Sequence, residues 1–531
     1  MGKYLDIGND GFQSIIRTRY VDKTGLIAYV NSTIDTTYKL TCSVRPRRFG
    51  KSFSSKMLCA YYVKGYDSRD LFKGLEIEKE HTFLTYLNQF HVIYLDITSF
   101  LSACETKENT VNYMKQELLN DLRDNFSFAS NERDIISTLL RIVNQTKEKF
   151  IFIIDEWDAI YREQKENKKL QEEYMELLRS LFKSIHTDKI CAAAYMTGIL
   201  PIKKYGRESA LSDFYEYTMV NAAPIEAYVG FTLEEVRQLC AENHLELNRL
   251  EQWYDGYRLG EERIYNPKSV MECIRRKKYG SYWTRTETYE SLKTYIELNF
   301  DGLKDAVIDM IGGQSYRVDT ESFQNDLTTL KTKDDVLTLL IHLGYLCYDE
   351  ERQKVSIPNR EIKEEFIRAI KNGSRTELVK AVQKSDELLK ATWDKDEHRV
   401  AEIISELHDS DTSHEFYNNE QALRSVIKMA YLSSIDYYVK LEELQAGKGY
   451  ADIVFWSKKN LDYPMLLVEL KWNQSAEGAI TQIKDNKYPS TIQKWDGEML
   501  LVGINYDKKT RIHECRILDL NRENHGVEHN G

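Results

Sequence analysis

Three consecutive residues, Gly50, Lys51 and Ser52, close a basic segment that lies between an apolar run and an amphipathic stretch. In such a loop, and at the start of the helix after it, backbone N–H groups point at phosphate oxygens. The lysine reaches the β- and γ-phosphates of a nucleoside triphosphate, and the serine hydroxyl binds Mg²⁺. We therefore predict that the loop binds ATP with Mg²⁺ through Arg47, Arg48, Phe49, Gly50, Lys51 and Ser52.

The segment departs from the usual nucleotide-binding pattern at one position. Arg45 stands where the first glycine of G-x-x-x-x-G-K-[ST] belongs. The alternative is a basic turn that only begins the following helix. The choice depends on whether a second strand brings acids to the same place.

Two acids follow the apolar run FIFII at 150–154. We predict that Asp155 orders Mg²⁺ through water and that Glu156 orients and deprotonates the attacking water. Thr197, at the end of the next apolar run, would sense the γ-phosphate, although Thr-Gly is also ordinary turn chemistry. Ligands of open α/β sheets gather at the carboxyl ends of strands, so the three residues are expected to lie beside the loop. The alternative is a strand that simply ends in a polar turn.

A second set of residues suits phosphodiester hydrolysis. Asp452 begins one apolar run, and Glu469 and Lys471 end the next, two positions apart and therefore on one face of a strand. Carboxylates of this kind bind Mg²⁺, which lowers the pKa of a bound water, and a lysine can orient that water. Gln482, in the helical pattern that follows, is expected to position the scissile phosphate or the lysine.

The alternative for this second set is an ordinary amphipathic strand that carries a surface ion pair between Glu469 and Lys471. The run MLLV before Glu469 argues against it, since it predicts a strand buried on both faces, where a charged pair needs a reason. We therefore predict a metal-dependent site.

Both sets of candidate site residues require particular strands and helices to position them. From 1 to 230 the chain alternates predicted strands, at 38–44, 91–97, 149–155, 189–196 and 215–220, with predicted helices, at 52–63, 107–124, 132–147 and 167–186. This order indicates an α/β domain with a mostly parallel sheet. From 231 to 410 the pattern is mainly helical, beginning with a threonine-capped helix at 231–244 and interrupted by a turn-rich segment at 253–267. From 411 to 531 we predict a second α/β domain, with helices at 419–434 and 475–487 and strands at 450–456, 465–472 and 499–505.

Several strings resemble the bacterial AAA-ATPase-like family, in the STAND-like group of P-loop ATPases. They are YVDKT at 20–24, RPRRFGKS at 45–52, IIDEWD at 153–158, TGILPI at 197–202, WYDGY at 253–257 and YNP at 265–267. The resemblance covers most of the chain. It implies an N-terminal ATP-binding domain joined to a C-terminal PD-(D/E)XK nuclease-like domain.

The C-terminal strings GYAD, LLVELKW and AITQIKDNKY resemble that nuclease-like domain. The family's E-x-x-x-G-x-G-x-x-D run, which ends at Asp452, implies that Glu443 is a further metal ligand. Tyr450 stands where the family usually has arginine, which weakens a phosphate contact but leaves the metal ligands. Glu420, on the preceding predicted helix, is a further candidate for assisting the metal.

Composition limits the partners of the chain. Its 531 residues suggest about three domains. There are 73 Lys and Arg against 84 Asp and Glu, a net charge of −11, which excludes a protein coated in positive charge. Residues 445–531 hold 12 of each sign, so positive charge for DNA must be arranged locally, come from a homo-oligomer, or come from Lys277, Lys278 and Arg285. The basic run at 275–278 is more simply a solvated helix face.

The eight cysteines contain no C-x-x-C pair, and no apolar run reaches the roughly 18 residues of a membrane helix. We therefore expect a soluble cytoplasmic protein without a membrane partner. The chain also lacks H-E-x-x-H and G-x-S-x-G motifs.

The leading hypothesis is a protein that binds and hydrolyses ATP and thereby regulates a Mg²⁺-dependent DNA endonuclease, with defence or mobile-element biology as the setting that the family resemblance suggests. The alternative is a nucleotide-dependent switch or adaptor whose nuclease-like domain binds nucleic acid or protein without cleaving it. Tyr450 and the neutral charge of the C-terminal segment favour this alternative.

Overall fold

The computed structural model describes most of the chain in two compact units. The described residues are 2–202, 211–283, 292, 294–295, 300, 302–323, 330–371, 376–411, 427, 430–431, 434, 437–446, 449–457, 463–485 and 497–520. Within these, the side chains of 304–305, 308, 370–371, 376–383, 408–411, 439–446 and 449–452 are not described. The first unit comprises Met1–Arg285, Phe300–Gly302 and Ser315–Glu364, and the second comprises Thr286–Asn299, Leu303–Gln314 and Glu365–Gly531.

A five-stranded parallel sheet forms the centre of the N-terminal part, in the order β2-β3-β4-β1-β5. Its strands are β1 (Leu40–Val44), β2 (His91–Asp96), β3 (Phe150–Asp155), β4 (Cys191–Gly198) and β5 (Tyr215–Tyr217). All five confirm predicted strands. In the register, Val44 pairs with Gly198 and Asp96 with Asp155, so these strands end at one edge of the sheet.

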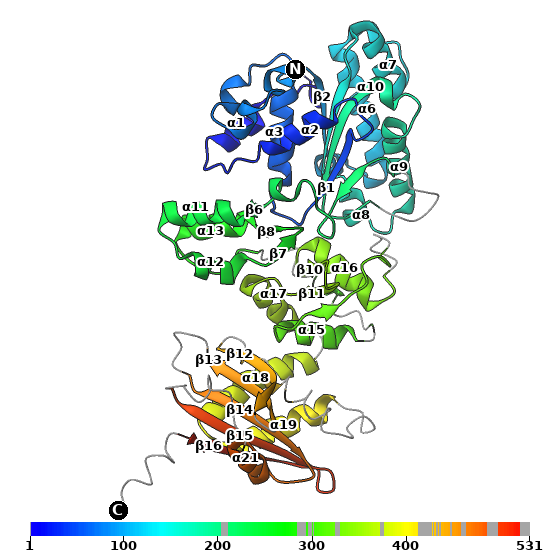
Figure 1. Cartoon of the computed structure of the whole chain (residues 1–531). Coiled ribbons are helices and arrows are strands. Elements are labelled where there is room, and N and C mark those ends of the chain that lie inside the picture. Colours follow the sequence, from blue (N-terminus) through cyan, green and yellow to red (C-terminus); the bar gives the residue numbers. More distant parts are fainter. Residues whose placement is uncertain are drawn as a thin grey trace, which may run out of the picture. The chain divides into compact units, whose positions relative to one another are not determined.

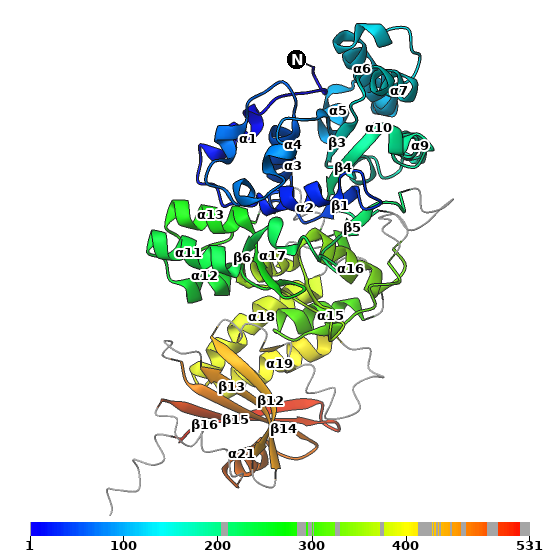
Figure 2. The same cartoon turned by 45° about the horizontal axis from the view of Figure 1, so that its top comes forward.

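Helices cover both faces of this sheet (Figures 1 and 2). One face packs on α1 (Asp10–Ile16), α2 (Gly25–Thr33) and α3 (Lys51–Tyr62). The other packs on α5 (Ile97–Ala103), α6 (Thr110–Asn125), α7 (Ile135–Thr146), α8 (Ala159–Glu163) and α9 (Lys168–Phe182). Short helices α4 (Phe83–Tyr86) and α10 (Thr187–Ile190) complete this part. Ile151 and Ile153 belong to one core cluster and Phe150, Phe152 and Ile154 to the other, which explains why β3 reads as a continuous apolar run.

The rest of the first unit combines helices with two small antiparallel sheets. The first sheet joins β6 (Phe231–Thr232), β8 (Glu262–Tyr265) and β7 (Tyr257–Leu259), beside α11 (Leu233–Asn243), α12 (Leu247–Tyr254) and α13 (Pro267–Arg276). The second joins β10 (Cys347–Asp349), β11 (Lys354–Ser356) and β9 (Tyr316–Arg317), and α16 (Lys333–Leu343) precedes β10. The predicted threonine cap is confirmed, because Thr232 and Glu235 form a reciprocal capping box at the start of α11. Helix α17 (Arg360–Lys371) begins in this unit.

The second unit contains a mixed five-stranded sheet in the order β12-β13-β14-β15-β16. The strands are β12 (Tyr438–Ala446), β13 (Gly449–Ser457), β14 (Met465–Trp472), β15 (Met499–Asp507) and β16 (Ile512–Asp519). Only β14 and β15 pair in parallel. Residues of α18 (Thr376–Trp393) and α19 (Glu397–Asp411) pack on one face, and α21 (Ala476–Asp485) packs on the other. Helix α15 (Leu303–Ile311) also belongs to this unit.

The predicted strands at 450–456, 465–472 and 499–505 and the helix at 475–487 are confirmed as β13, β14, β15 and α21. The predicted helix at 419–434 falls almost entirely outside the described residues. Within the described part of the chain, no helix combines the length and the apolar character needed to cross a membrane.

Candidate functional site

The basic loop connects the end of β1 to the start of α3. Gly50 precedes the helix with φ at 94°, in the left-handed region that glycine adopts without a steric penalty. An added Cβ there would meet nothing within 4 Å, so the backbone angle rather than space requires this glycine. The first N–H groups of α3 therefore follow directly from a glycine turn, which is the geometry of a phosphate-binding loop.

Lys51 is the buried cation of this loop. Only 4% of its side chain is exposed, and its Nζ donates to the backbone oxygen of Pro46 at 3.1 Å. The same Nζ lies 3.4 Å from Oε1 of Glu156. Glu156, which follows β3, is thus brought to the loop, as expected from the sequence.

Asp155 ends β3 and is almost completely buried. Thr197 Oγ1 donates to its Oδ1, and the Tyr94 hydroxyl donates to its Oδ2 at 3.2 Å. Burial raises the pKa of the Asp155 carboxyl, and hydrogen bonds from Thr197 and Ser52 act against that rise. The structure therefore gathers Ser52, Asp155 and Thr197, and their oxygen atoms suit Mg²⁺.

Glu156 occupies a strained backbone position, because its φ of 53° is in the left-handed region that a non-glycine residue rarely adopts. Its N–H donates to Thr197 Oγ1 at 3.4 Å, and its Oε2 accepts from Arg162 Nη2 at 2.5 Å. Burial alone would raise the pKa of the Glu156 carboxyl, but the Lys51 and Arg162 cations outweigh it and lower this pKa. The Glu156 carboxylate is thereby kept ionised beside Lys51 of the loop.

Sequence reasoning missed two residues beside this acid. Asp158 is fully buried, and its Oδ2 accepts from the N–H groups of Ile199 and Leu200 at 3.2 and 2.8 Å. Arg162 donates from Nε to the same oxygen at 2.9 Å. The signal was present in the sequence, because Asp158 and Arg162 have the four-residue spacing of a helical ion pair.

The side chains ahead of Gly50 contact other parts of the first unit. Arg45 is fully buried, and its Nη1 donates to the backbone oxygens of Val44, Tyr217 and Thr218 at 2.9 to 3.2 Å. Burial lowers the pKa of Arg45 to about 10. Arg45, at the place of the missing glycine, thus joins the end of β1 to the end of β5.

Phe49 and Arg48 face the region after residue 230. The Phe49 ring packs edge-on against Tyr257 with centroids 5.3 Å apart, and the Tyr257 hydroxyl donates to the Gly344 oxygen at 2.6 Å. Arg48 Nη1 donates to the Tyr282 oxygen at 3.2 Å. Arg47 is half-buried and helps to lower the pKa of Glu156, with a smaller effect than Lys51 and Arg162. Nucleotide contacts by these side chains remain predictions.

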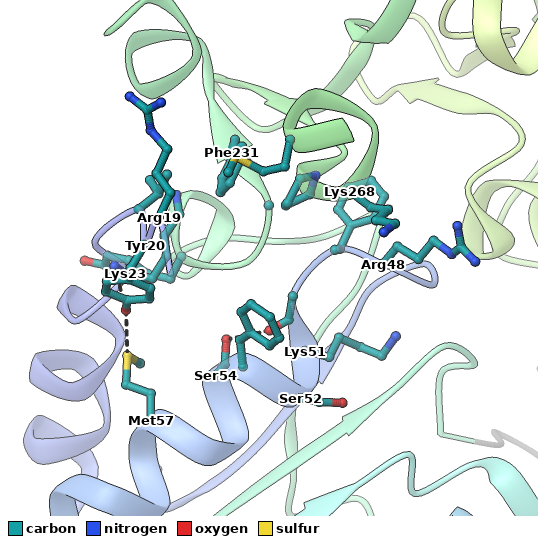
Figure 3. Close-up of a pocket in the computed structure, with 18 of the residues that line it drawn as sticks. Arg19, Tyr20, Lys23, Arg48, Lys51, Ser52, Ser54, Met57, Phe231 and Lys268 are labelled. Atoms are coloured by element: carbon teal, nitrogen blue, oxygen red, sulfur yellow. Dashed lines mark hydrogen bonds between the residues drawn. The ribbon is translucent and has the colours of Figure 1, made fainter. Parts of the chain in front are cut away.

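A cavity of about 370 Å³ adjoins the loop (Figure 3). Its size falls in the range of small-molecule sites. It is lined by Arg19, Tyr20, Val21, Lys23, Arg48, Phe49, Gly50, Lys51, Ser52, Phe53, Ser54, Met57, Glu156, Tyr228, Gly230, Phe231, Pro267, Lys268 and Met271. The lining combines five cations with many apolar side chains, which suits a nucleoside with a phosphate chain.

The YVDKT segment forms one wall of this cavity and connects it to α11. Lys23 Nζ lies 2.6 Å from both carboxylate oxygens of Glu235 and donates to the Ala227 oxygen at 2.7 Å. Tyr20 donates from its hydroxyl to the sulfur of Met57 on α3 at 3.3 Å (Figure 3). The segment therefore holds the walls of the cavity together.

The second unit contains the predicted acid–lysine pair. Glu469 on β14 is 2% exposed, and Lys471 Nζ lies 3.2 Å from its Oε1. Gln482 on α21 bridges them, because it accepts from Lys471 and donates to Glu469. The surface ion-pair alternative is therefore wrong, since the pair lies beneath α21.

The strand register aligns the other predicted metal ligands. In β12 and β13 the pairs Glu442↔Ile453 and Leu444↔Ala451 flank Glu443 and Asp452. The neighbouring pair Ile453↔Val468 places Asp452 next to Glu469 in the adjoining strand. All three acids therefore occupy one row across three strands.

The side chains of Glu443, Asp452 and Tyr450 lie outside the description, and Glu420 lies outside the described residues altogether. Among the described side chains, no three acids, histidines or cysteines form a metal-binding group. Three acidic residues at neighbouring positions of the sheet nevertheless carry the oxygen donors that Mg²⁺ prefers. The metal assignment remains a prediction.

Gly503 was also missed by sequence reasoning. It pairs with Glu469 in the register, and an added Cβ would lie 2.4 Å from the backbone oxygen of Ala476 on α21. The glycine thus permits the close approach of helix to sheet that brings Gln482 to the Glu469–Lys471 pair.

The basic run at 275–278 behaves as a helix face rather than a binding site. Arg275 and Arg276 both pair with Glu272 of the same helix, and Lys277 donates to the Asn243 oxygen at 2.7 Å. Arg285 lies outside the described residues.

A parallel sheet with a glycine-lysine-serine loop after one strand and acids after another is typical of P-loop ATPases. The mixed sheet with its acid–lysine pair forms a second, separate site. Comparison with family models agrees. The family described as Predicted AAA-ATPase matches residues 6–206, and the PD-(D/E)XK nuclease superfamily matches residues 418–515. The chain therefore carries an AAA-ATPase-like domain at its N-terminal end and a PD-(D/E)XK nuclease superfamily domain at its C-terminal end.

A relative spans almost the whole chain. It is a protein of Azotobacter chroococcum mcd 1 named "Uncharacterized protein in vnfD 5'region", 20% identical over 522 residues, which cover 93% of each chain. Similar solved structures include replication initiator DnaA bound to AMPPCP and single-stranded DNA, at 13% identity, 72% coverage of this chain, 92% of that chain and a TM-score of 0.27. The structure of AMPPCP-bound DnaA from Aquifex aeolicus is 12% identical, with coverage of 78% of this chain and 96% of that chain and a TM-score of 0.29.

Proposed function

We propose that this protein binds and hydrolyses ATP in its first unit and that the nucleotide state regulates a Mg²⁺-dependent DNA endonuclease in its second unit. The assembly of Lys51, Ser52, Asp155, Glu156 and Thr197 at one edge of the parallel sheet supports the ATPase. Glu469, with its contacts to Lys471 and Gln482 and its place in one row of the sheet with Asp452 and Glu443, supports the nuclease.

In the ATPase, each residue has a defined task. Lys51 exchanges the Pro46 oxygen and Glu156 for the β- and γ-phosphates, which are stronger acceptors. Ser52 and Asp155 would hold Mg²⁺, which supplies neutralisation of phosphate charge. Glu156, released from Lys51, accepts the proton of the attacking water. The cavity beside the loop takes the nucleoside.

The test is ATP binding by calorimetry to the wild type and to Lys51→Ala. We expect the variant to lose binding by at least about 100-fold, because Lys51 is the buried cation of the loop at the start of α3. Unchanged affinity would refute the assignment of the loop. Phosphate release by the wild type then distinguishes hydrolysis from binding alone.

In the nuclease, Asp452, Glu469 and Glu443 would hold Mg²⁺, which supplies a water of lowered pKa. Lys471 orients that water or neutralises charge on the phosphate, and Gln482 fixes the lysine. The test is plasmid cleavage with Mg²⁺ by the wild type, Asp452→Ala and Lys471→Ala. Equal activity in all three would exclude this site as the source of cleavage.

The contacts of Lys471 favour a second candidate function. Lys471 already donates hydrogen bonds to Glu469 and Gln482, as it would in a domain that binds DNA or protein without cutting it. Tyr450 fits the same alternative. A wild type that shifts DNA in a gel but never cleaves it, with Mg²⁺ and ATP present, would establish the adaptor.

We place this activity in the cytoplasm, with DNA as the partner, and in defence or mobile-element biology. All eight cysteines are free thiols and six are buried, which suits a reducing compartment. The balanced charge of residues 445–531 supports a homo-oligomer as the source of additional phosphate contacts. Sedimentation with and without ATP tests that assembly.

A further inference from the structure

Arg162 is a buried cation that the proposed ATPase chemistry does not yet use. It lies on α8, which follows β3 directly, and 10% of its side chain is exposed. Nη2 donates to Glu156 Oε2 at 2.5 Å, and Nε donates to Asp158 Oδ2 at 2.9 Å. The guanidinium therefore spans two carboxylates of the same strand-to-helix turn.

The second carboxylate fixes the arginine in place. Besides Arg162, Asp158 Oδ2 accepts from the N–H groups of Ile199 and Leu200, which follow β4. Gly198 makes room for this contact, because an added Cβ would lie 2.5 Å from the Trp157 ring and 2.9 Å from Asp158 Oδ1. Arg162 is thus anchored, through Asp158, to the turns that follow β3 and β4. It therefore leaves the Glu156 carboxylate little freedom to reorient.

The two oxygens of Glu156 have different partners. Oε1 faces Lys51 at 3.4 Å, and Oε2 is bound by Arg162. An incoming polyphosphate competes for Lys51, since phosphate oxygens are strong acceptors for that ammonium. It does not compete for Arg162, which is anchored to Asp158. Nucleotide binding therefore frees Oε1 and leaves Oε2 restrained.

We propose that Arg162 is a positioning residue for ATP hydrolysis, which holds Glu156 by Oε2 so that Oε1 is presented to the attacking water. The inference rests on the proposed ATPase function. It explains how a glutamate with a strained backbone keeps one orientation after its lysine partner leaves. It also assigns Asp158 the task of orienting Arg162.

The experiment measures kcat, KM and ATP affinity for the full chain with Arg162→Gln, Arg162→Lys, Glu156→Gln and the double variant Arg162→Gln/Glu156→Gln. Arg162→Gln should lower kcat at least about 10-fold and change ATP affinity less than about 3-fold, because the arginine acts on orientation and not on binding. Arg162→Lys should recover part of kcat, because lysine keeps the charge but lacks the planar fork that spans two carboxylates.

The double variant separates positioning from a general structural role. If Arg162 acts through Glu156, its loss in the Glu156→Gln background should cost less than about 2-fold in the residual rate. An equal loss in both backgrounds, an increase in kcat, or wild-type kcat in Arg162→Lys and Arg162→Gln would each overturn the proposal. If Arg162→Gln does not fold, as judged by thermal unfolding, the intermediate kcat expected of Arg162→Lys decides.

The outcomes also distinguish this inference from the proposed function. A wild type that binds ATP but never releases phosphate would overturn hydrolysis and, with it, the role of Arg162. A wild type that hydrolyses ATP, with Glu156→Gln strongly impaired and Arg162→Gln fully active, would overturn the role of Arg162 alone.

Discussion

Each unit of this molecule places a lysine within ion-pair distance of a glutamate, and the two pairs differ in how they are held. In the first unit, Lys51 and Glu156 come from separate segments and are 3.4 Å apart. In the second, Glu469 and Lys471 are neighbours on one face of β14 and are 3.2 Å apart. The first pair can separate when a ligand arrives, whereas the second is fixed by its strand.

The third member of each site differs as well. Glu156 has a second cation, Arg162, but the Glu469–Lys471 pair has a neutral amide, Gln482, that contacts both members. Asp158 balances Arg162, so the positive charge available to a polyphosphate comes from Lys51 and the other cations that line the cavity. A balanced pair suits a site whose further charge comes from a metal and from neighbouring strands. We therefore expect the same two residue types to serve different ligands.

The sharpest test of this difference replaces the glutamate of each pair with glutamine. Glu156→Gln should leave ATP affinity equal or tighter, because Lys51 loses a competing partner, and should lower hydrolysis at least about 100-fold because the base is gone. Glu469→Gln should weaken Mg²⁺ binding at least about 10-fold, because a ligand carboxylate is lost. Calorimetry and phosphate release measure these effects. Weaker ATP binding by Glu156→Gln would contradict the separable pair.

Two glycines test how each site is packed. Gly503→Ala should destabilise the second unit by about 1–3 kcal/mol, because the added Cβ meets the Ala476 backbone oxygen, which cannot move alone. Gly198→Ala should also destabilise the first unit, because the added Cβ would lie 2.5 Å from the buried Trp157 ring and 2.9 Å from Asp158 Oδ1. Denaturant unfolding measures both. Gly478→Ala in α21 is the matched control and should be neutral or stabilising, because only the Ser475 hydroxyl lies near it.

Gln482 tests the neutral member of the second site. Gln482→Leu should reduce plasmid cleavage about 10-fold, because Lys471 loses the acceptor that orients it. ATP affinity should not change. Thr481→Ala, on the exposed side of the same helix, should leave cleavage intact. A Gln482→Leu protein as active as this control would remove Gln482 from the site.

A cluster of three exposed basic side chains around the nearly buried Glu272 gives the smallest expected effect and a scale for the others. Hydrogen bonds from Lys268, Arg275 and Arg276 lower the pKa of Glu272 to about 2. A depressed carboxyl pKa stabilises the fold above its unfolded value near 4.3 and loses that contribution as pH falls towards 2. Glu272→Gln should therefore cost less than about 1 kcal/mol at pH 7 and nothing at pH 2, by thermal unfolding. A constant difference across that range would contradict the ion-pair cause.

Strands that are buried on both faces were predictable from the sequence, and most of the shorter or more polar ones were not, with β5 as an exception. β3 and β14 read as apolar runs because helices cover both of their faces. The strands of the two small sheets have two to four residues, too few to show a period. β12, with the sequence YVKLEELQA, has a mixed pattern that suits a helix equally well.

The predictability of the sites follows the same logic. Residues within a recognised string, such as Lys51 and Asp155, are predictable because the string itself carries their chemistry. Arg45 shows in the sequence only as a departure from the glycine pattern, because its partners at the end of β5 are about 170 residues away in the chain. Gly503 carries no sequence signal at all, since its role is defined by a helix that packs over it.

The phosphate loop has a consequence for where this protein can be cut. Its side chains Pro46 and Phe49 rest on Gly344 and Tyr257, far beyond the end of the matched AAA-ATPase segment at residue 206. A fragment that ends near residue 230 would keep Gly50, Lys51, Asp155 and Glu156, yet expose the apolar side of the loop to water. The matched AAA-ATPase segment is thus continuous in the chain, but residues downstream of it hold its phosphate loop in place.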